Sequence, residues 1–251
     1  MTSALPPLAP PLADDTLAKL RHVSTATLTS QLIKVAGLRT RSPLNIRPLN
    51  MAKCRFVGPA VTLRYGPLRE DLEKSMANLA AEGNPTRRVI EESAAGSVVV
   101  IDAGGNVGGG AVGDILAARM IFRGIAGLVT DGAMRDAGPL MEMDLPVHAR
   151  AFTPPPNTAS TLAIGCNEVV SCGGVLVFPG DIVVGDEDGV VVIPRHLADK
   201  IAVSGLEQEQ VEAYIKRRVE LGEPIAGFYP AGERTLAEYR AWVEDGKPSL
   251  G

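Results

Sequence analysis

The amino-acid sequence predicts an α/β protein built on a buried sheet. Hydrophobic residues make up 45% of the 251 residues but aromatic residues only 4%. The core is therefore expected to consist of Val, Ile, Leu and Ala side chains, which suits strands that are covered on both faces. A largely β-branched run at 97–102 predicts such a strand, and a helix at 114–122 and a second strand at 127–130 follow it. Strand, helix and strand at this spacing predict a right-handed parallel crossover.

Further elements are predicted on the N-terminal side of this unit. Acidic residues at 14–15 favour a helix that continues through residues 16–22. Ser24 and Thr25 can cap a second helix at 26–35, which Gly37 would close. Helices are also expected at 71–82 and 85–95. Residues 56–65 predict a pair of strands, broken at Gly58 and Pro59 because this dipeptide is typical of turns.

The C-terminal half is predicted to be rich in strands. Segments of β type occur at 145–150, 168–170, 175–177, 181–184 and 190–193, with turns at 172–174, 179–181 and 185–189. A long amphipathic helix is expected at 195–221. Since there is no internal repeat and no clear linker, one domain is expected at 14–228. It lies between a proline-rich N-terminal arm (1–13) and a C-terminal tail (229–251) with a weaker helical signal at 236–242.

Charge and cysteine content argue against several classes of protein. The net charge is −4 and the two signs are interspersed, so no basic stripe indicates binding to nucleic acid. Cys54, Cys166 and Cys172 are too few and too irregularly spaced for a disulfide framework or a zinc site, and we expect free thiols. No apolar run reaches the about 18 residues that span a membrane, and the N-terminus lacks the pattern of a signal peptide. We therefore expect a soluble cytoplasmic protein.

The glycine-rich stretch at 104–113 is the first part of a candidate site. Gly113 immediately precedes the start of the helix predicted at 114–122, where free N–H groups and the helix dipole can bind a carboxylate or phosphate. The alternative is that the glycines only permit tight packing and that Asp114 is the N-cap. The stretch is neither a P-loop nor a dinucleotide fingerprint, because no Gly-Lys-Ser/Thr follows and the glycine spacing is wrong.

Arg135 and Asp136 are the second part of the candidate site. They follow the strand predicted at 127–130 and a turn predicted at 131–133. Adjacent side chains of opposite charge are expected to diverge and to bind two different groups. A guanidinium suits a carboxylate and a carboxylate suits a divalent cation. Together with Asp114 they predict a site for Mg²⁺ and a small oxo-acid, while the alternative is a solvated surface pair.

Other candidate catalysts are less convincing. The three histidines, His22, His148 and His196, are scattered along the chain. The lysines lie outside the glycine-rich unit, so no Schiff-base lysine is indicated. The acidic segment at 185–189 lacks the spacing of an EF-hand and is predicted to be a hairpin turn.

Several of these motifs carry a resemblance to a known family. The chain resembles the class II pyruvate aldolases, which are 4-hydroxy-4-methyl-2-oxoglutarate / 4-carboxy-4-hydroxy-2-oxoadipate aldolases. Their superfamily also includes the proteins named regulator of ribonuclease E activity A. The resemblance covers roughly residues 24–225, and the matching motifs are Gly113-Asp114, Leu116-Ala117, Arg123-Gly124, Gly127, Asp131-Gly132, Arg135-Asp136, Leu145-Pro146-Val147, Pro179-Gly180-Asp181 and 186–191.

The resemblance implies a β/β/α swivelling-type layered domain with mixed central sheets and flanking helices. It implies that Arg135 binds the pyruvyl carboxylate, that Asp136 ligates Mg²⁺ (or Mn²⁺), and that Asp114 holds the metal through water. Gly113 and Asp114 would complete the substrate site together with Ile115 and Leu116, whose first-turn amides would bind substrate oxygens.

The resemblance also implies a homo-oligomer, a trimer or hexamer with its sites between subunits. The C-terminal helix of a neighbouring subunit would supply an acid near the proton-transfer water. Glu209 and Glu212 are the two candidates, and the sequence leaves the choice between them open.

The expected function is a metal-dependent retro-aldol cleavage of a 4-hydroxy-2-oxo acid to pyruvate through a metal-stabilised enolate, with oxaloacetate decarboxylation as a companion activity. One alternative is a non-catalytic regulator that binds a ribonuclease, since fold alone does not decide function. A second alternative is a lyase of the same fold for a different oxo-acid or sugar-acid. The basic early segment, with Arg39, Arg41, Arg47, Arg64 and Arg69, leaves room for such a specificity.

Overall fold

A curled mixed sheet organises the computed structural model, which describes residues 12–72 and 78–247. Seven strands follow one path: β1 (Arg47–Pro48), β5 (Val147–Phe152), β4 (Gly127–Met134), β3 (Val98–Asp102), β2 (Phe56–Pro67), β9 (Ile182–Gly185) and β10 (Val190–Ile193). Strand β6 (Thr161–Cys166) pairs with β2 off this path. Neighbours from β2 to β5 are parallel, and the other pairs are antiparallel. The predicted parallel crossover is therefore confirmed.

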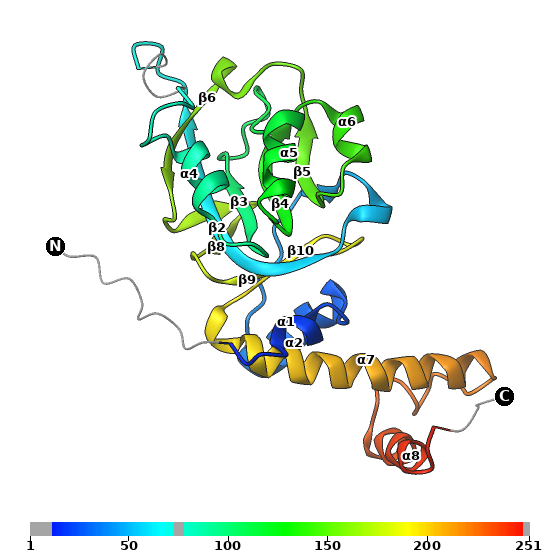
Figure 1. Cartoon of the computed structure of the whole chain (residues 1–251). Coiled ribbons are helices and arrows are strands. Elements are labelled where there is room, and N and C mark those ends of the chain that lie inside the picture. Colours follow the sequence, from blue (N-terminus) through cyan, green and yellow to red (C-terminus); the bar gives the residue numbers. More distant parts are fainter. Residues whose placement is uncertain (1–11, 73–77, 248–251) are drawn as a thin grey trace.

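Helices α4 (Pro85–Glu92), α5 (Asp114–Phe122) and α6 (Ala137–Glu142) cover one face of the parallel strands (Figure 1). In β3, Val99 and Ile101 belong to the core beneath these helices. Val98 and Val100 belong to a second core, which includes the two-stranded ribbon of β7 (Val170–Cys172) and β8 (Val175–Val177). Because both faces of β3 are buried, its sequence is an uninterrupted apolar run. The predicted class, a mixed α/β fold with flanking helices, is confirmed.

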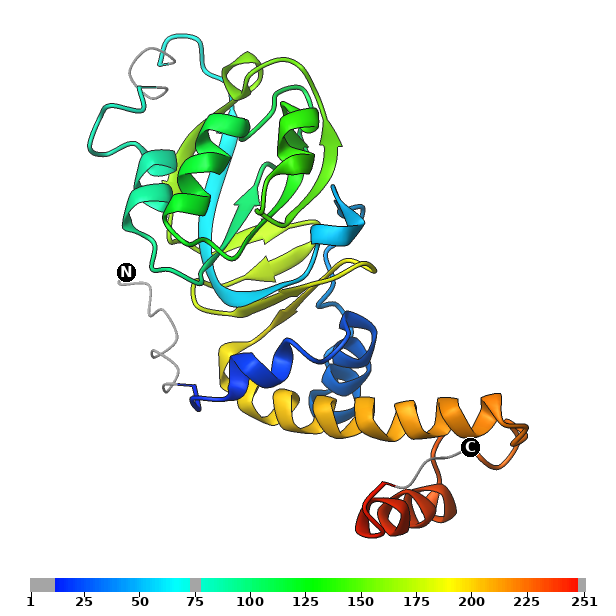
Figure 2. The same ribbon diagram turned by 45° about the vertical axis from the view of Figure 1, so that its right-hand side comes forward.

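A second group of helices packs against β9 and β10. It consists of α1 (Thr16–Leu20), α2 (Thr25–Ala36) and α7 (Ala198–Glu220), and its core joins Leu20, Leu28 and Ile201 to Ile182 and Val191. Figures 1 and 2 show α7 extending beyond the sheet, with α8 (Glu233–Glu244) alongside its outer half. This last helix includes the weak helical signal at 236–242 but begins earlier.

Two acidic side chains fix the start of α2. The carboxylate of Asp186, which is 3% exposed, accepts hydrogen bonds from the Thr25 backbone N–H and hydroxyl, both at 2.7 Å. Glu209 of α7 accepts from the Ser24 N–H at 2.8 Å and from its hydroxyl at 2.7 Å. The hairpin turn predicted at 185–189 joins β9 to β10 as expected, and its first acid also anchors α2.

The predicted break at Gly58 and Pro59 is wrong, because β2 runs through both residues. Residues 56–59 pair antiparallel with β9, whereas residues 60–64 pair parallel with β3. The dipeptide therefore marks the place where the strand changes partner. Glycine is required here because a Cβ at Gly58 would lie 2.0 Å from the carbonyl oxygen of Gly96.

Two other local predictions are corrected. Residues 131–133 belong to β4 rather than to a turn, although the register against β5 shifts between Thr130 and Ala133. The buried carboxylate of Asp131 supports this bulge by accepting from the N–H groups of Ala103 at 2.8 Å and Gly173 at 3.3 Å. Of the helix predicted at 71–82, residues 78–82 form turns and bends instead, and residues 73–77 lie outside the described part of the chain.

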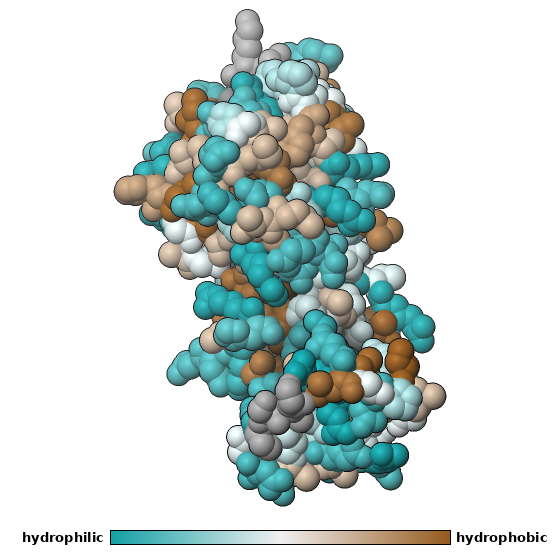
Figure 3. Space-filling model, turned by 90° about the vertical axis from the view of Figure 1, so that its right-hand side faces the viewer, coloured by the Kyte–Doolittle hydropathy of each residue, from teal (hydrophilic) through white to brown (hydrophobic). Residues whose placement is uncertain are grey.

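The remaining general expectations concern thiols and the surface. All three cysteines are free, and two of them are buried. On the face shown in Figure 3, hydrophilic and hydrophobic residues are interspersed, in keeping with the mixed charges of the sequence. None of the helices within residues 12–72 and 78–247 is long and apolar enough to cross a membrane.

We expect Gly58→Ala to lower the free energy of unfolding by about 2 kcal/mol or more, because backbone atoms of Gly96 would have to move to admit the methyl group. Gly83→Ala is the matched control, since a Cβ at Gly83 meets no atom within 4 Å. Urea denaturation of both variants tests this expectation. Equal midpoints would contradict the proposed close contact between β2 and Gly96.

Candidate active site

The glycine-rich loop lies against the C-terminal end of β4. Gly110 forms a parallel bridge with Ala133, and the Ala111 N–H donates to the Ala133 carbonyl at 2.8 Å. The Arg135 N–H in turn donates to the Val112 carbonyl at 3.2 Å. The loop therefore extends the sheet at the carboxyl ends of its parallel strands, the position at which open α/β sheets bind ligands.

Two of the glycines allow this loop to approach the Arg135–Asp136 pair. A Cβ at Gly110 would lie 2.8 Å from the Cβ of Arg135, and one at Gly113 would lie 2.3 Å from Oδ2 of Asp136. The alternative interpretation, that the glycines permit tight packing, therefore holds at these positions. What they pack against is the pair of charged side chains that the sequence singled out.

The start of α5 brings Asp114 next to Asp136. Gly113 is the N-cap, so Asp114 is the first helical residue and not the N-cap. The Asp114 N–H donates to Oδ2 of Asp136 at 3.4 Å, and Oδ1 of Asp114 accepts from the Ile115 N–H at 2.8 Å. A ligand that used the Ile115 amide would have to displace this carboxylate. Leu116 follows in the same turn and is half-buried.

Arg135 and Asp136 contact each other, contrary to the expectation that they diverge. Nε of Arg135 lies 3.1 Å from Oδ2 of Asp136, and the side chains are 38% and 30% exposed. Asp136 has a left-handed backbone, with φ 59° and ψ 45°, at the N-cap of α6. A guanidinium has five N–H donors, so this contact leaves donors for a ligand carboxylate.

The carboxylates of Asp114 and Asp136 suit a hard divalent cation. Within the described part of the chain, no group of three or more His, Cys, Asp or Glu side chains is arranged to hold a metal. Mg²⁺ binds through one or two carboxylates and keeps water or substrate oxygens as its other ligands. Two acids beside an arginine therefore fit Mg²⁺ or Mn²⁺.

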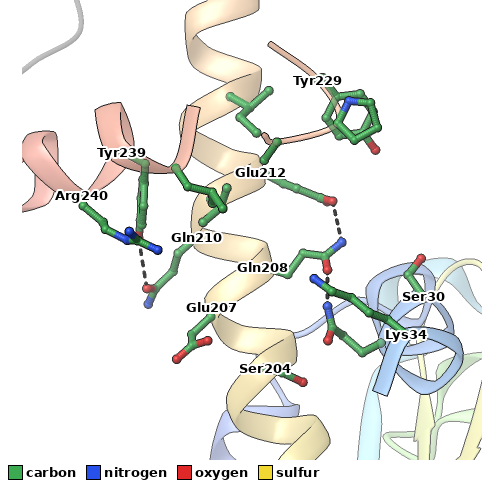
Figure 4. A pocket seen from close by; sticks show the side chains of 16 residues that line it. Ser30, Lys34, Ser204, Glu207, Gln208, Gln210, Glu212, Tyr229, Tyr239 and Arg240 are labelled. Carbon is green, nitrogen blue, oxygen red and sulfur yellow. Dashed lines mark hydrogen bonds between the residues drawn. The ribbon is translucent and has the colours of Figure 1, made fainter. Parts of the chain in front are cut away.

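Glu209 and Glu212 lie in a different part of the chain from these residues. Figures 1 and 2 show α5 against the parallel strands and α7 at the other end of the molecule, beyond β9 and β10. The carboxylate of Glu209 is bonded to Ser24, as described above. Glu212 accepts a hydrogen bond from Nε2 of Gln208 at 2.8 Å and faces a groove between α2, α7 and α8 (Figure 4). Among the described residues, these two acids accept hydrogen bonds from Ser24 and Gln208, whereas Arg135 pairs with Asp136.

That groove is large, about 730 Å³, but it is a weaker candidate for the catalytic site. Its lining combines amide, hydroxyl and apolar side chains with separate charges such as Lys34 and Arg240 (Figure 4). It contains neither a glycine-lined helix start nor a close pair of acids beside an arginine. The side chains gathered at Gly113 and Asp136 therefore make that region a better candidate for catalysis than this groove.

Sequence reasoning missed the covering of the glycine loop by the segment after β5. The Gly110 N–H donates to the Pro155 carbonyl at 2.9 Å, and a Cβ at Gly109 would lie 2.6 Å from the Pro156 oxygen. Asn157 follows in the same segment. The only local signal was a run of prolines, which predicts a loop but not the part of the molecule that the loop covers.

Comparison with known proteins identifies relatives of this chain. The family model described as RraA-like, aldolase/RraA, matches residues 23–192. A Halalkalibacterium halodurans protein named "Putative 4-hydroxy-4-methyl-2-oxoglutarate aldolase" is 33% identical over 181 residues, which are 72% of this chain and 77% of that protein. A Deinococcus radiodurans protein of the same name is 34% identical over 143 residues, 56% and 79% of the two chains.

A solved structure is also similar. The crystal structure of Streptomyces coelicolor RraAS2, described as an unusual member of the RNase ES inhibitor RraA protein family, has a TM-score of 0.72 and 31% identity. The similarity covers 83% of this chain and 98% of that one. The relatives therefore carry the names of aldolases and of ribonuclease inhibitors.

We expect Gly113→Ala to weaken Mg²⁺ binding at least tenfold, because the new methyl group would occupy the position of the Asp136 carboxylate. Gly138→Ala is the control, since it lies in nearby α6 and its Cβ would meet no atom within 4 Å. Isothermal titration with Mg²⁺, or Mn²⁺ titration followed by electron paramagnetic resonance, measures the affinity. Unchanged affinity in Gly113→Ala would show that the cation binds elsewhere.

Proposed function

The chain belongs to the RraA-like, aldolase/RraA family, and from this membership we propose that it is a divalent-metal-dependent carbon–carbon lyase. Its reaction is the cleavage of a 4-hydroxy-2-oxo acid to pyruvate and a carbonyl compound, with decarboxylation of oxaloacetate as a side activity. The observation that supports this best is the convergence of Arg135, Asp136 and Asp114 at the start of α5.

Arg135 binds the carboxylate of the substrate in this proposal. Its guanidinium is held by Asp136 at 3.1 Å and by the packing of its stem against Gly110. A side chain held in this way loses little freedom on binding, which favours an oriented substrate. Asp136 and Asp114 hold the Mg²⁺ or Mn²⁺ ion, which when bound supplies Lewis-acid stabilisation of negative charge on the 2-oxo oxygen.

The start of α5 also stabilises negative charge on the 2-oxo oxygen of the substrate. The N-terminal end of a helix carries partial positive charge, so the first turn after Gly113 stabilises an oxyanion that develops beside it. The 4-hydroxyl gives its proton to a base, the C3–C4 bond breaks, and its electron pair moves toward the 2-oxo group. Protonation at C3 completes pyruvate. Loss of carbon dioxide from oxaloacetate leaves an electron pair on the same carbon, C3, and protonation there again gives pyruvate.

The base is provided by α7 of a neighbouring subunit in a trimer or hexamer. Between the two acids of α7, Glu212 is better suited than Glu209. Glu209 accepts from both polar groups of Ser24 within its own chain, whereas Glu212 accepts a hydrogen bond from the neighbouring Gln208 side chain and faces a groove. Glu209 is then a residue that anchors α2.

A protein that regulates a ribonuclease by binding is the second candidate function. The similarity to S. coelicolor RraAS2, a member of a ribonuclease-inhibitor family, supports it. So do Ile115 and Phe122 on α5, which are 81% and 77% exposed and suit a protein contact. A pure binding surface, however, has no need for two acids and an arginine gathered at a helix start. A lyase of the same fold that acts on another oxo-acid or a sugar-acid is also consistent with these residues. Such an enzyme would use Arg135, Asp136 and Asp114 in the same way and would bind the rest of its substrate differently.

We expect the purified protein to release pyruvate from oxaloacetate and from a 4-hydroxy-2-oxo acid in the presence of Mg²⁺. Excess EDTA should abolish this release. Arg135→Ala should lower kcat/KM about 10²- to 10³-fold, as loss of one aligned charge contact typically does. Arg119→Ala is the control, since this exposed arginine of α5 pairs with Glu91 outside the site. Absence of Mg²⁺-dependent pyruvate release would contradict the proposed activity, and full activity in Arg135→Ala would contradict its role.

The two acids of α7 should respond differently to substitution. We expect Glu212→Gln to lower kcat at least tenfold without loss of stability, and Glu209→Gln to lower stability by about 1–2 kcal/mol. Partial burial raises the pKa of Glu209, but the hydrogen bonds from Ser24 outweigh it and the pKa is lowered. The stabilisation by Glu209 is therefore present above its ordinary pKa and is lost as pH falls through the lowered value.

Urea denaturation of wild type and Glu209→Gln at pH 7 and at acidic pH tests this difference. The two proteins should differ at pH 7 and converge in acid. If Glu209→Gln abolished turnover while its unfolding curve matched wild type, the assignment of the two acids would have to be reversed.

A further inference from the structure

A small cavity lies beside the first turn of α5, next to the candidate site. Its volume is about 70 Å³, enough for a fragment of a few non-hydrogen atoms. Tyr65 of β2, Asn84 and Thr86 at the start of α4, Ala111 of the glycine-rich loop and Leu116 of α5 line it. The cavity is therefore bordered by the starts of two helices and by the loop that contacts Arg135.

Two residues connect this cavity to the candidate site. The Ala111 N–H donates to Ala133, close to Arg135, while its carbonyl accepts the Tyr65 hydroxyl at 3.2 Å. Leu116 lies two residues after Asp114, so its backbone belongs to the first turn of α5 while the residue also lines the cavity. A substrate with its carboxylate at Arg135 would have to extend across this turn to bring its other end to the cavity.

The described residues that line the cavity are polar or apolar but none is charged. Tyr65 is 5% exposed, and burial raises the pKa of its phenol, which keeps the ring neutral. A second carboxylate placed here would lose water and would gain no opposite charge from the described lining, only neutral partners such as the amides of Asn84 and Asn157.

The hydroxyl groups of the cavity present acceptors rather than donors. The Tyr65 hydroxyl has one proton, and the Ala111 carbonyl at 3.2 Å can only accept it. The Thr86 hydroxyl lies 3.3 Å from the Tyr65 oxygen and can donate to it. With both protons used in this way, lone pairs of the two oxygens remain for a ligand. A hydroxyl group of a ligand can donate to them, whereas a carboxylate cannot.

We propose that this cavity receives the substituent on C4 of the substrate and selects 4-hydroxy-2-oxo acids that release a small, uncharged, hydroxylated aldehyde. The inference rests on the proposed lyase function. In the cleavage of 4,5-dihydroxy-2-oxopentanoate, the 4-hydroxyl proton goes to the base, the C3–C4 bond breaks, and a proton adds to C3. The products are pyruvate and glycolaldehyde, with no oxidation or reduction. The C5 hydroxyl donates to the oxygens of Tyr65 and Thr86.

Three substrates that differ only at C5 test the proposal. Pyruvate release is measured with 4,5-dihydroxy-2-oxopentanoate, with 4-hydroxy-2-oxopentanoate, and with 4-hydroxy-2-oxoglutarate, which carries a carboxylate at that position. The expected kcat/KM for the dihydroxy compound is at least tenfold above that for the glutarate and several-fold above that for the methyl compound. Oxaloacetate has no C4 substituent of this kind, so its decarboxylation measures the activity of the metal site independently of the cavity.

Two conservative variants assign the preference to the cavity. Tyr65→Phe and Thr86→Val each remove a hydroxyl, and each should reduce the ratio of dihydroxy to methyl turnover at least threefold. Tyr214→Phe removes the hydroxyl of another buried tyrosine, on α7, and should leave the ratio at the wild-type value. Because a ratio is compared within each protein, a general loss of folded enzyme does not affect it.

The outcomes separate this inference from the proposed function. Equal or faster turnover of the glutarate would overturn the inference but leave the lyase function intact. An unchanged ratio in both Tyr65→Phe and Thr86→Val would overturn it in the same way. If neither oxaloacetate nor any of the three hydroxy acids yields pyruvate in Mg²⁺, the lyase function fails and the inference fails with it.

Discussion

The close approach between the backbone of residues 110–113 and the Arg135–Asp136 pair is the constraint on which the candidate site depends. The start of α5 comes within hydrogen-bonding distance of the Asp136 carboxylate because position 113 has no Cβ, which would otherwise lie 2.3 Å from that carboxylate. The same approach places Asp114 beside a second acid and supports the stem of Arg135. The absence of a side chain at Gly113 therefore allows the start of α5, the carboxylates of Asp114 and Asp136, and the guanidinium of Arg135 to lie close together.

The acidic residues of this chain divide into two groups by their environment. Asp131, Asp181 and Asp186 are at most 7% exposed, and each accepts hydrogen bonds from backbone amides of loops or turns. Burial raises the pKa of Asp131 and of Asp181, so these groups bind amides at a desolvation cost and act as scaffold. Asp114 and Asp136 are half-exposed and remain accessible to a cation. Burial, rather than residue type, separates structural acids from those that can do chemistry.

The two halves of helix α7 pack against different parts of the molecule. Its first half packs against β10 and the N-terminal helices, and Glu209 anchors the start of α2 there. Its second half extends beyond the sheet and packs through Tyr214 against Phe228 and Trp242. Glu212 lies near the boundary of the two halves. In the proposed function the acid at this position acts on a neighbouring chain, whereas Glu209 holds α2 of its own chain.

Short sequence patterns correctly predicted those helices, strands and turns that depend on only a few neighbouring residues. The helix at 114–122 coincides with α5, the β-branched run coincides with the doubly buried β3, and the 185–189 turn joins β9 to β10. In each case the period of apolar residues or the turn composition reports directly on burial and on backbone geometry. The glycines, Arg135 and Asp136 were also visible in the sequence as candidate site residues.

Only the tertiary structure decided how these parts meet. The change of partner along β2, the inclusion of residues 131–133 in β4, and the loop at Pro155 and Pro156 that covers the glycines all depend on contacts between distant residues. The same is true of the contact between Arg135 and Asp136, where Asp136 has a left-handed backbone. Residue type and spacing determined which groups the chain offers. Long-range packing determined their distances, because no local pattern specifies which distant backbone atoms a side chain will meet.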